Sequence, residues 1–343
     1  MSTAKTDIIK IRFSTPWSHI DFNSRVAPNP GYQYIFDDTD EPVDYWVIWG
    51  DIKPVQSTGV CPPQNIIYIT DEVNEQRFYL QPFLNQFAAV ITCRTDLRHA
   101  HILQHHELNT WMVQRSYQQL VAETFIEKSK KISVVSSNLT WLPGHKKRFA
   151  LVNKLAGHFK DKLAVFGKGI HPVADKYDAL APYQYSIAIE NSAVPGYFTE
   201  KITDCYLTHT MPVYFGCPDI DNYFDADTML KIDVENFEGT VQQIEQLLDE
   251  DPYQQLLPLI YQQKQRYLSA YHIFNILPSL LQQHFNNRSG HVKNRIKAER
   301  CFYRGYAINQ LLGKAQHLLQ VPTGYRFQLQ FSQHQLYSNQ TLK

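Results

Sequence analysis

Two short polar segments near the middle of the chain carry the side chains best suited to bind an anionic ligand. Residues 190–192 (Glu-Asn-Ser) follow the apolar run 185–189, and residues 199–201 (Thr-Glu-Lys) stand where a helix is expected to begin. Open α/β sheets bind ligands beyond the carboxyl ends of their strands, and the N–H groups of a helix N-terminus attract phosphate. Lys201 adds a mobile cation, and Gly216 allows close backbone approach after the next strand. The pattern indicates a diphosphate-binding crevice.

A purely structural interpretation of the same residues stays open at this point. Thr199 then caps a helix, and Glu200 and Lys201 form a solvated charge pair.

The elements that must position these residues alternate between short apolar runs and helical patterns. This alternation is typical of parallel sheets with crossover helices. A length of 343 residues favours two α/β domains, which we place at residues 1–130 and 131–285, with a polar and helical tail at 286–343. The expected strands are 9–13, 44–49, 65–70, 88–92, 132–136, 163–167, 185–189 and 211–215, and the expected helices are 75–87, 117–128, 145–159, 199–208 and 272–285.

Composition excludes several classes of protein. The 33 basic and 33 acidic side chains give a formal net charge of zero, which argues against nucleic-acid binding. Five cysteines without a CxxC pair argue against a disulfide framework and a zinc knuckle. The first residues lack the apolar region of a signal peptide, and no later run predicts a membrane span, so we expect a cytoplasmic protein. The basic run 288–300 leaves open a weak peripheral contact with anionic lipid headgroups, although a solvated face is the default.

Two groups of residues resemble metal ligands without a complete set. His101 and His105 have the i, i+4 spacing of a helical metal pair, but no acidic or cysteine partner stands at a matching interval. Asp225 and Asp227 form a D-x-D triplet beyond the expected ligand-binding loop, where a turn is favoured. The sequence therefore predicts no metal site and no cofactor.

The polar segments resemble a specific family signature. The run Glu-Asn-Ser, then Gly-Tyr-Phe-Thr-Glu-Lys at 196–201, then Met-Pro-Val-Tyr-Phe-Gly at 211–216 is similar to the donor-site pattern of the family-10 α1,3/α1,4-fucosyltransferases. The similarity continues upstream through residues 136–138 (Ser-Ser-Asn), 145–148 (His-Lys-Lys-Arg) and 166–169 (Phe-Gly-Lys-Gly). Weaker similarity reaches residues 62–72, so that about two thirds of the chain is covered and the tail is not.

The resemblance implies a GT-B fold, in which two Rossmann-like domains face each other across a cleft and the C-terminal one binds the nucleotide. It implies that Asn191 holds the donor, Tyr197 contacts the nucleotide, Glu200 binds fucose or ribose hydroxyls, and Lys201 binds the diphosphate. Arg148 becomes a second phosphate cation, suited by its bidentate fork, although a surface helix position is the alternative. Further donor contacts are implied for Ser137, Asn138 and Gly167.

The catalytic base of the family is a glutamate just after a strand of the N-terminal domain. The matching residue here is Glu72, in Thr-Asp-Glu where the family often has Thr-Gly-Glu. Because Asp71 replaces the glycine, Asp71 and Glu75 stay open as candidates for the base. A helix cap formed by residues 71–72 is the structural alternative.

The function implied by the resemblance is inverting transfer of L-fucose from GDP-β-L-fucose to a hydroxyl of a glycan acceptor, without a metal. The linkage would be α1,3 or α1,4 to a sugar of the GlcNAc or Glc type. Lipopolysaccharide, a Lewis-type N-acetyllactosamine and a protein-linked glycan all stay open as acceptors. The alternatives are a GT-B enzyme with another nucleotide sugar and an inactive glycan- or nucleotide-binding relative.

Overall fold

The computed structural model describes residues 8–36, 38–138 and 142–302. Residues 303–343, which make up most of the predicted tail, lie outside the described residues. Within the described part of the chain, no helix combines the length and the apolar character needed to traverse a bilayer.

Two parallel sheets form the framework, as the sequence predicts for an α/β protein. The first has six strands in the order β2-β1-β3-β5-β6-β7 and the second has five in the order β12-β11-β10-β8-β9. The strands of the first sheet are β1 (Ile9–Ser14), β2 (Tyr32–Ile35), β3 (Tyr45–Trp49), β5 (Ile66–Ile69), β6 (Ala89–Thr92) and β7 (Ile102–Gln104). Those of the second are β8 (Lys130–Val135), β9 (Leu163–Phe166), β10 (Tyr183–Ile189), β11 (Met211–Phe215) and β12 (Leu230–Lys231). An antiparallel pair is formed by β4 (Gln56–Cys61) and β13 (Val292–Lys297).

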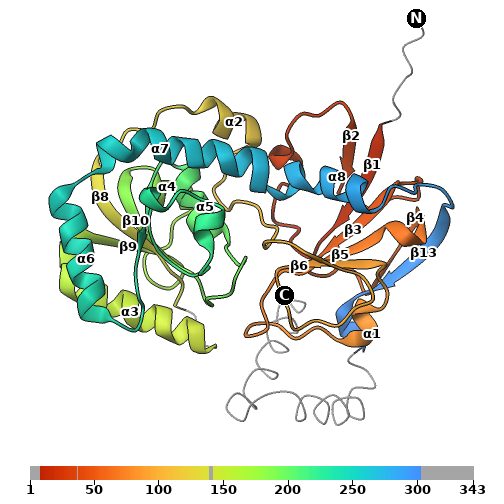
Figure 1. Ribbon diagram of the computed structural model, residues 1–343, viewed down its shortest axis with the longest axis horizontal. Helices are drawn as coiled ribbons and strands as arrows, with labels where there is room; N and C mark the ends of the chain where they lie inside the picture. The colour runs from red at the N-terminus through yellow and green to blue at the C-terminus, as the bar shows by residue number, and fades with distance from the viewer. Residues whose placement is uncertain (1–7, 37, 139–141, 303–343) are drawn as a thin grey trace, which may run out of the picture.

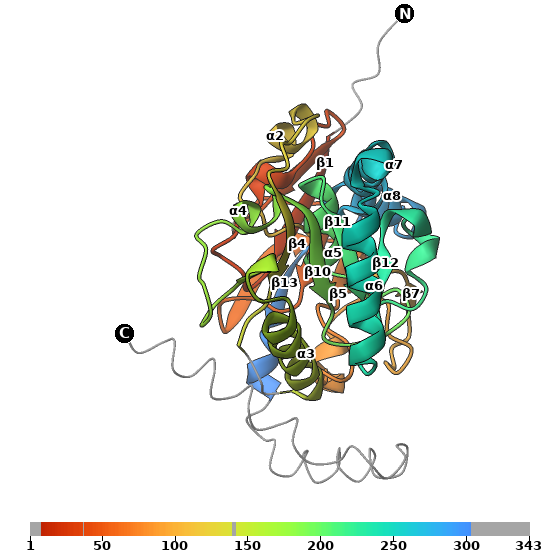
Figure 2. The same ribbon diagram turned by 90° about the vertical axis from the view of Figure 1, so that its left-hand side faces the viewer.

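The two sheets lie in separate halves of the molecule. In Figure 1 the second sheet and its helices are on the left, the first sheet is on the right, and α7 and α8 run in succession along the top from one half to the other. Figure 2 looks onto the second half, where α3 and α6 run alongside each other and His158 Nε2 lies 2.9 Å from Glu245 Oε1. The helices are α1 (Gln81–Leu84), α2 (Tyr117–Ala122), α3 (Pro143–Phe159), α4 (Lys176–Leu180), α5 (Glu200–Leu207), α6 (Phe237–Glu250), α7 (Tyr253–Arg266) and α8 (Ile273–His284).

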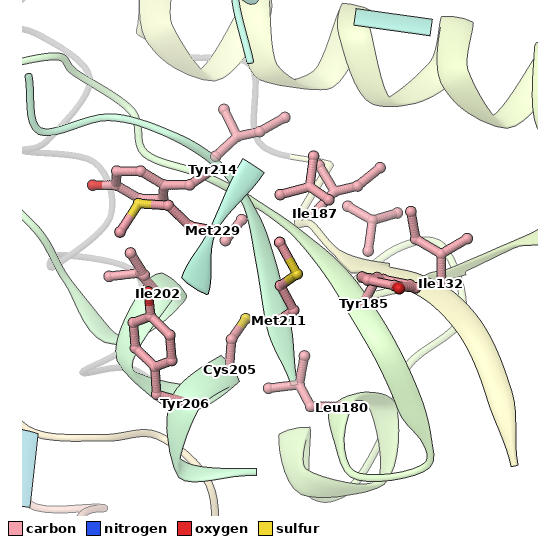
Figure 3. Packing of buried hydrophobic residues seen from close by; sticks show 14 of the residues in the cluster. Ile132, Leu180, Tyr185, Ile187, Ile202, Cys205, Tyr206, Met211, Tyr214 and Met229 are labelled. Carbon is pink, nitrogen blue, oxygen red and sulfur yellow. The ribbon is translucent and has the colours of Figure 1, made fainter. Parts of the chain in front are cut away.

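The core of the second half is built from the runs that the sequence marks as buried strands. All seven residues of β10 are buried, which is the pattern of a central strand covered on both faces. Figure 3 shows Tyr185 and Ile187 of β10 and Met211 of β11 in one cluster with Ile202 and Cys205 of α5. This packing fixes the start of α5 relative to the carboxyl end of β10.

One predicted helix is wrong. Residues 75–87 were expected to be helical, but only α1 is, and residues 74–80 form an irregular loop. The reason is tertiary: the side chains of Gln76, Arg77 and Tyr79 in this loop are bound to partners outside it. An N-cap function for residues 71–72 is therefore excluded, because no helix begins near Glu75.

The chain returns to the first half after the second is complete. Buried side chains of α8, including Phe274 and Leu277, pack in the same cluster as Ile11, Phe13 and Tyr45 of the first sheet. A π-helical turn, Tyr267–Tyr271, connects α7 to α8, and β13 then pairs with β4. The domain boundaries of the sequence analysis stay a prediction, but residues 273–297 contribute their packing to the first half. Lys293, Arg295 and Lys297 alternate along one exposed face of β13, and their contact with lipid also stays a prediction.

Phe274 provides a test of whether α8 packs in the core of the first half. Its ring is 3% exposed and lies 5.1 Å from that of Phe13, 5.1 Å from Tyr34 and 5.4 Å from Phe36. Phe274→Ala should lower the free energy of unfolding by about 3–5 kcal/mol, because it removes a buried ring and leaves a cavity. Denaturant unfolding measures this loss. Phe125→Ala, at a ring that is 72% exposed, is the control, and equal effects of the two changes would show that α8 is not part of this core.

Candidate active site

A fully buried carboxylate organises the segment that follows β10. Glu190 is 1% exposed and accepts hydrogen bonds from the Thr199 backbone N–H at 2.8 Å and from the Thr199 hydroxyl at 2.9 Å. Lys201 Nζ donates to Glu190 Oε2 at 2.9 Å and to Thr199 Oγ1 at 2.9 Å. Thr199 is also the N-cap of α5, since its side chain accepts from Lys201 N–H. The cap predicted at Thr199 is therefore confirmed, but Lys201 pairs with the buried Glu190 and not primarily with Glu200, whose Oε1 lies 3.9 Å from Nζ.

Charged neighbours keep both Lys201 and Glu200 ionised. Burial works against ionisation of both Lys201 and Glu200, but their mutual attraction outweighs it. Lys201 and Lys176 together lower the pKa of Glu200 to about 2, and Glu190 and Glu200 raise the pKa of Lys201. An ammonium group has three N–H donors, and Glu190 and Thr199 take two of them.

Arg148 lies on the buried side of α3, at the same edge of the sheet. It is 7% exposed, its Nη2 donates to Ser137 Oγ at 3.0 Å, and its Nη1 donates to Asn191 Oδ1. A surface position for Arg148 is therefore excluded. The structure brings together Arg148, Ser137 and Asn191, which the resemblance implies as donor contacts.

Three buried polar atoms close to this cluster have no hydrogen-bond partner among the described residues: Arg148 Nε, His145 Nδ1 and Ser192 Oγ. Burial and the nearby charges of Arg148 and Lys201 lower the pKa of His145 to about 4. Buried polar atoms are normally paired, so three unpaired ones around two cations indicate a position for a polar, anionic ligand.

Glycines let the backbone close around this position. Gly167 has φ +136°, and a Cβ there would lie 1.8 Å from the Ser136 carbonyl oxygen. A Cβ on Gly144 would lie 1.8 Å from the Asn191 carbonyl oxygen. At Gly216 it would meet Glu190 Cγ at 2.4 Å, so this glycine makes room for the buried carboxylate. Asn138, by contrast, is exposed, and a Cβ on Gly169 would meet its side chain.

An ion-pair network of the first half holds the loop that follows β5. Asp71 accepts from Arg77 Nη1 at 2.6 and 2.7 Å and from the Tyr79 hydroxyl at 2.6 Å. Arg77 Nη2 donates to Glu299 Oε2 at 2.7 Å, and Glu299 also accepts from Leu80 N–H at 3.1 Å. Glu299, which follows β13, therefore connects the two ends of the loop, because it binds Leu80 directly and Asp71 through Arg77.

Glu72 lies opposite the motif of the second half. The Tyr197 hydroxyl donates to Glu72 Oε2 at 2.9 Å, and Gln76 Nε2 donates to the same hydroxyl at 3.0 Å. Asn191 Nδ2 in turn donates to Gln76 Oε1 at 3.2 Å. The carboxyl edges of the two sheets thus meet through side chains of the loops that follow β5 and β10.

The three candidates for the base differ in their surroundings. Burial, the largest effect, and the neighbouring Asp71 raise the pKa of Glu72 to about 8, while Tyr197 and Lys201 act in the opposite direction. Asp71 has both carboxylate oxygens bound to Arg77. Glu75 is exposed to solvent. A half-buried carboxyl group with a raised pKa is suited to take a proton near neutral pH, so these surroundings favour Glu72.

The histidine and aspartate pairs that resemble metal ligands in the sequence do not form a metal site among the described residues. His101 and His105 flank the short strand β7, so they do not share a helix face. Asp225 and Asp227 are exposed. Over residues 8–36, 38–138 and 142–302, no group of three or more His, Cys, Asp and Glu side chains is placed to hold a metal ion.

Sequence reasoning missed several residues of the site. Gln76 and Lys176 were not singled out, and Glu190 was noted only for its place after a strand. Lys176 Nζ lies 2.9 Å from Asp204 Oδ2, beside the start of α5. No local pattern marks Gln76, because its partners come from the other half. A cavity of about 550 Å³ lies away from the site, between β12 and α6, and Lys231, Asp233 and Asn236 are among the residues that line it.

Comparisons with known proteins show which proteins the chain is similar to. Residues 125–270 match the family described as glycosyltransferase family 10 (fucosyltransferase) C-term. The α-(1,3)-fucosyltransferase FucT of Helicobacter pylori is 34% identical over 76 residues, which are 22% of this chain and 16% of that protein. The chain thus aligns with only about a sixth of that relative.

Solved structures resemble the chain over a greater length. The crystal structure of an α1,3-fucosyltransferase has a TM-score of 0.51 at 17% identity, over 85% of this chain and 93% of that chain. A second, described as α1,3-fucosyltransferase with GDP-fucose, has a TM-score of 0.46 at 18% identity, over 75% and 83%. At such identity the first of these likenesses establishes the fold, which is GT-B. The family match is separate from this likeness, and it assigns residues 125–270 of this chain to glycosyltransferase family 10, the fucosyltransferases.

Proposed function

We propose that the chain is an inverting fucosyltransferase, which transfers L-fucose from GDP-β-L-fucose to a hydroxyl of a glycan acceptor. The proposed linkage is α1,3 or α1,4 to a GlcNAc- or Glc-type sugar. One observation carries the proposal: Glu72 of the first half faces the Arg148–Lys201 side of the family-10 domain through Tyr197. A base and two cations on opposite sides of one position are what displacement of a nucleoside diphosphate needs.

Proton removal from the acceptor is assigned to Glu72. Its carboxylate takes the proton of the attacking hydroxyl while the acceptor oxygen bonds to C1 of fucose. The bond from C1 to the β-phosphate oxygen breaks on the opposite side of the sugar, so the configuration at C1 inverts. GDP leaves with that electron pair.

Stabilisation of the leaving GDP is assigned to Arg148 and Lys201. The unpaired Arg148 Nε–H and the third N–H of Lys201 are available to phosphate oxygens, as are His145 and Ser192 for hydrogen bonding. Such charge-assisted contacts are stronger in a buried site than in water. Glu200, whose pKa is lowered to about 2, stays ionised and accepts hydrogen bonds from fucose or ribose hydroxyls. Asn191 and Tyr197 orient the donor from the other side.

Nucleotide titration tests the donor assignment. We expect GDP to bind more tightly than UDP or ADP in isothermal titration calorimetry. Arg148→Ala and Lys201→Ala should each weaken GDP binding by about 1.5–3 kcal/mol, because each removes a charge-assisted contact. Lys146→Ala, at an exposed position of the same helix, is the matched control. Unchanged GDP affinity in either site variant would remove that cation from the donor site, and a preference for UDP would favour a different nucleotide sugar.

Metal independence is the second expectation. Two protein cations take the place of the divalent ion that neutralises the diphosphate in D-x-D enzymes. Fucose transfer should therefore persist in excess EDTA. Complete loss under chelation, restored by Mn²⁺, would contradict this mechanism and return Asp225 and Asp227 to consideration.

Glu72→Gln tests the base and the reaction together. The change keeps size but removes proton affinity, so GDP should still bind while turnover of GDP-[¹⁴C]fucose with a glycan panel falls by about 10²–10⁴-fold. Because the deprotonated carboxylate is the active form and burial raises its pKa to about 8, kcat/KM of the wild type should rise with pH and level off above that value. A profile that falls over the same range would contradict Glu72 as the base.

The neighbouring carboxylates are the controls for this variant. Glu75→Gln, at an exposed residue, should be mild. Asp71→Asn should reduce activity only through the loop that Asp71 holds with Arg77. Near-normal turnover of Glu72→Gln beside an inactive Asp71 or Glu75 variant would move the base to that residue. No transfer by the wild type to any acceptor, with GDP still bound, would favour an inactive relative.

A further inference from the structure

The side chain of Gln76, in the loop of residues 72–80, contacts both Asn191 and Tyr197. It is 6% exposed, and its amide uses opposite ends for the two contacts. Nε2 donates to the Tyr197 hydroxyl at 3.0 Å, and Oε1 accepts from Asn191 Nδ2 at 3.2 Å. The second half is thereby bound twice by a residue four positions after the proposed base.

The direction of these hydrogen bonds determines which way the tyrosine donates. A phenol has one proton, and the oxygen of Tyr197 is already an acceptor for Gln76. Its proton therefore goes to Glu72 Oε2, at 2.9 Å. Without the Gln76 N–H, the Tyr197 hydroxyl can rotate and donate its proton to another acceptor. The carboxylate of Glu72 then loses a hydrogen-bond donor that stabilises its ionised form.

The same amide reaches the donor side. Asn191 donates to Gln76 through Nδ2 and accepts from Arg148 through Oδ1. An unbroken series of side-chain hydrogen bonds therefore runs from Glu72 through Tyr197, Gln76 and Asn191 to Arg148 and Ser137. The series thus connects Glu72 to Arg148, two residues to which the proposed reaction assigns a task.

The backbone of the loop makes this position rigid. Gln76 N–H and Arg77 N–H both donate to the Val73 carbonyl oxygen, at 3.0 and 2.9 Å. Arg77 then bridges Asp71 and Glu299, so the turn is held at both ends. A side chain fixed in this way loses little conformational freedom on forming its two contacts, which suits it to positioning other groups.

We infer that Gln76 is a positioning residue: it orients the Tyr197 hydroxyl toward Glu72 and, through Asn191, links the base to the cation that faces the donor diphosphate. The catalytic role of Gln76 rests on the proposed function. The hydrogen bonds that Gln76 makes are independent of that function.

The charged and titratable groups that act on Glu72 come from several elements. Asp71 precedes it, Glu107 follows β7, Tyr197 belongs to the loop before α5, and Glu200 and Lys201 open α5. A change at Gln76 leaves all of these in place. A shift in the titration of Glu72 then does not come from a lost charge, and the double-mutant cycle described below tests whether it comes from the tyrosine hydrogen bond.

The experiment follows the Glu72 carboxyl group by ¹³C NMR in the full chain labelled with [¹³C]glutamate, and the Glu72→Gln spectrum assigns its signal. Gln76→Met keeps the length of the side chain and removes both hydrogen bonds. The pKa of Glu72 should rise by about 0.5–1 unit, the size expected for loss of one hydrogen bond to a carboxylate. Gln81→Met is the matched control, because Gln81 is an exposed glutamine that bonds only within the first half, to Asn85 and Arg98. It should cause no shift.

A double-mutant cycle with Tyr197→Phe separates positioning from general damage. Tyr197→Phe removes the hydroxyl that Gln76 orients, so Gln76→Met should add no further shift in that background. Equal additional shifts in both backgrounds, or a Glu72 that titrates in Gln76→Met as it does in the wild type, would overturn the inference. In the active enzyme, the acidic limb of the kcat/KM profile should move by the same amount. If the wild type transferred no fucose while the NMR shifts held, the proposed function would fail and the positioning of Glu72 by Gln76 would stand.

Discussion

The hydrogen bond from Tyr197 to Glu72 connects the carboxyl edge of one sheet to that of the other, and the geometry of the site depends on it. It forms only if the loop between β10 and α5 and the loop after β5 are brought together at hydrogen-bonding distance. Two hydrogen bonds from the segment after β7 support that approach: the Glu107 backbone N–H donates to the Gly196 carbonyl at 2.8 Å, and the Asn109 side chain donates through Nδ2 to the Phe198 carbonyl at 2.8 Å. Gly196 has φ +71°, a conformation that favours glycine, so the turn before Tyr197 follows from residue choice.

Buried charge is the second constraint on the site. A carboxylate as deeply buried as Glu190 requires partners, because desolvation of an unpaired charge costs several kcal/mol. Its partners are the cap of α5 and Lys201, so the requirement to satisfy Glu190 also determines where the lysine points. Arg148 is held in the same way by Ser137 and Asn191. Both cations are therefore in place before any ligand arrives, and little reorganisation is needed to receive a phosphate.

Much of the framework could be predicted from the sequence, because buried parallel strands are continuous apolar runs that need no partner to be recognised. The predicted strands 9–13, 185–189 and 211–215 correspond to β1, β10 and β11, and Thr199 is the N-cap of α5. Strands β2 and β4 were missed, since Tyr32–Ile35 lies at a sheet edge and Gln56–Cys61 is polar and pairs with a segment more than 230 residues away. The loop at 74–80 has helical periodicity, but Gln76, Arg77 and Tyr79 use that spacing for contacts with Tyr197, Glu299 and Asp71. The resemblance pointed to the residues that we propose for the donor side, whereas Gln76 and Glu299 bind partners that no local pattern reveals.

The central claim is that residues of both halves form a single donor site around Arg148 and Lys201, and a crystal structure of the full chain with GDP tests it most directly. The β-phosphate oxygens should lie within hydrogen-bonding distance of Arg148 Nε and Lys201 Nζ, with Glu72 on the opposite side of the β-phosphate. GDP bound away from both cations, for example in the cavity lined by Lys231 and Asn236, would contradict the account.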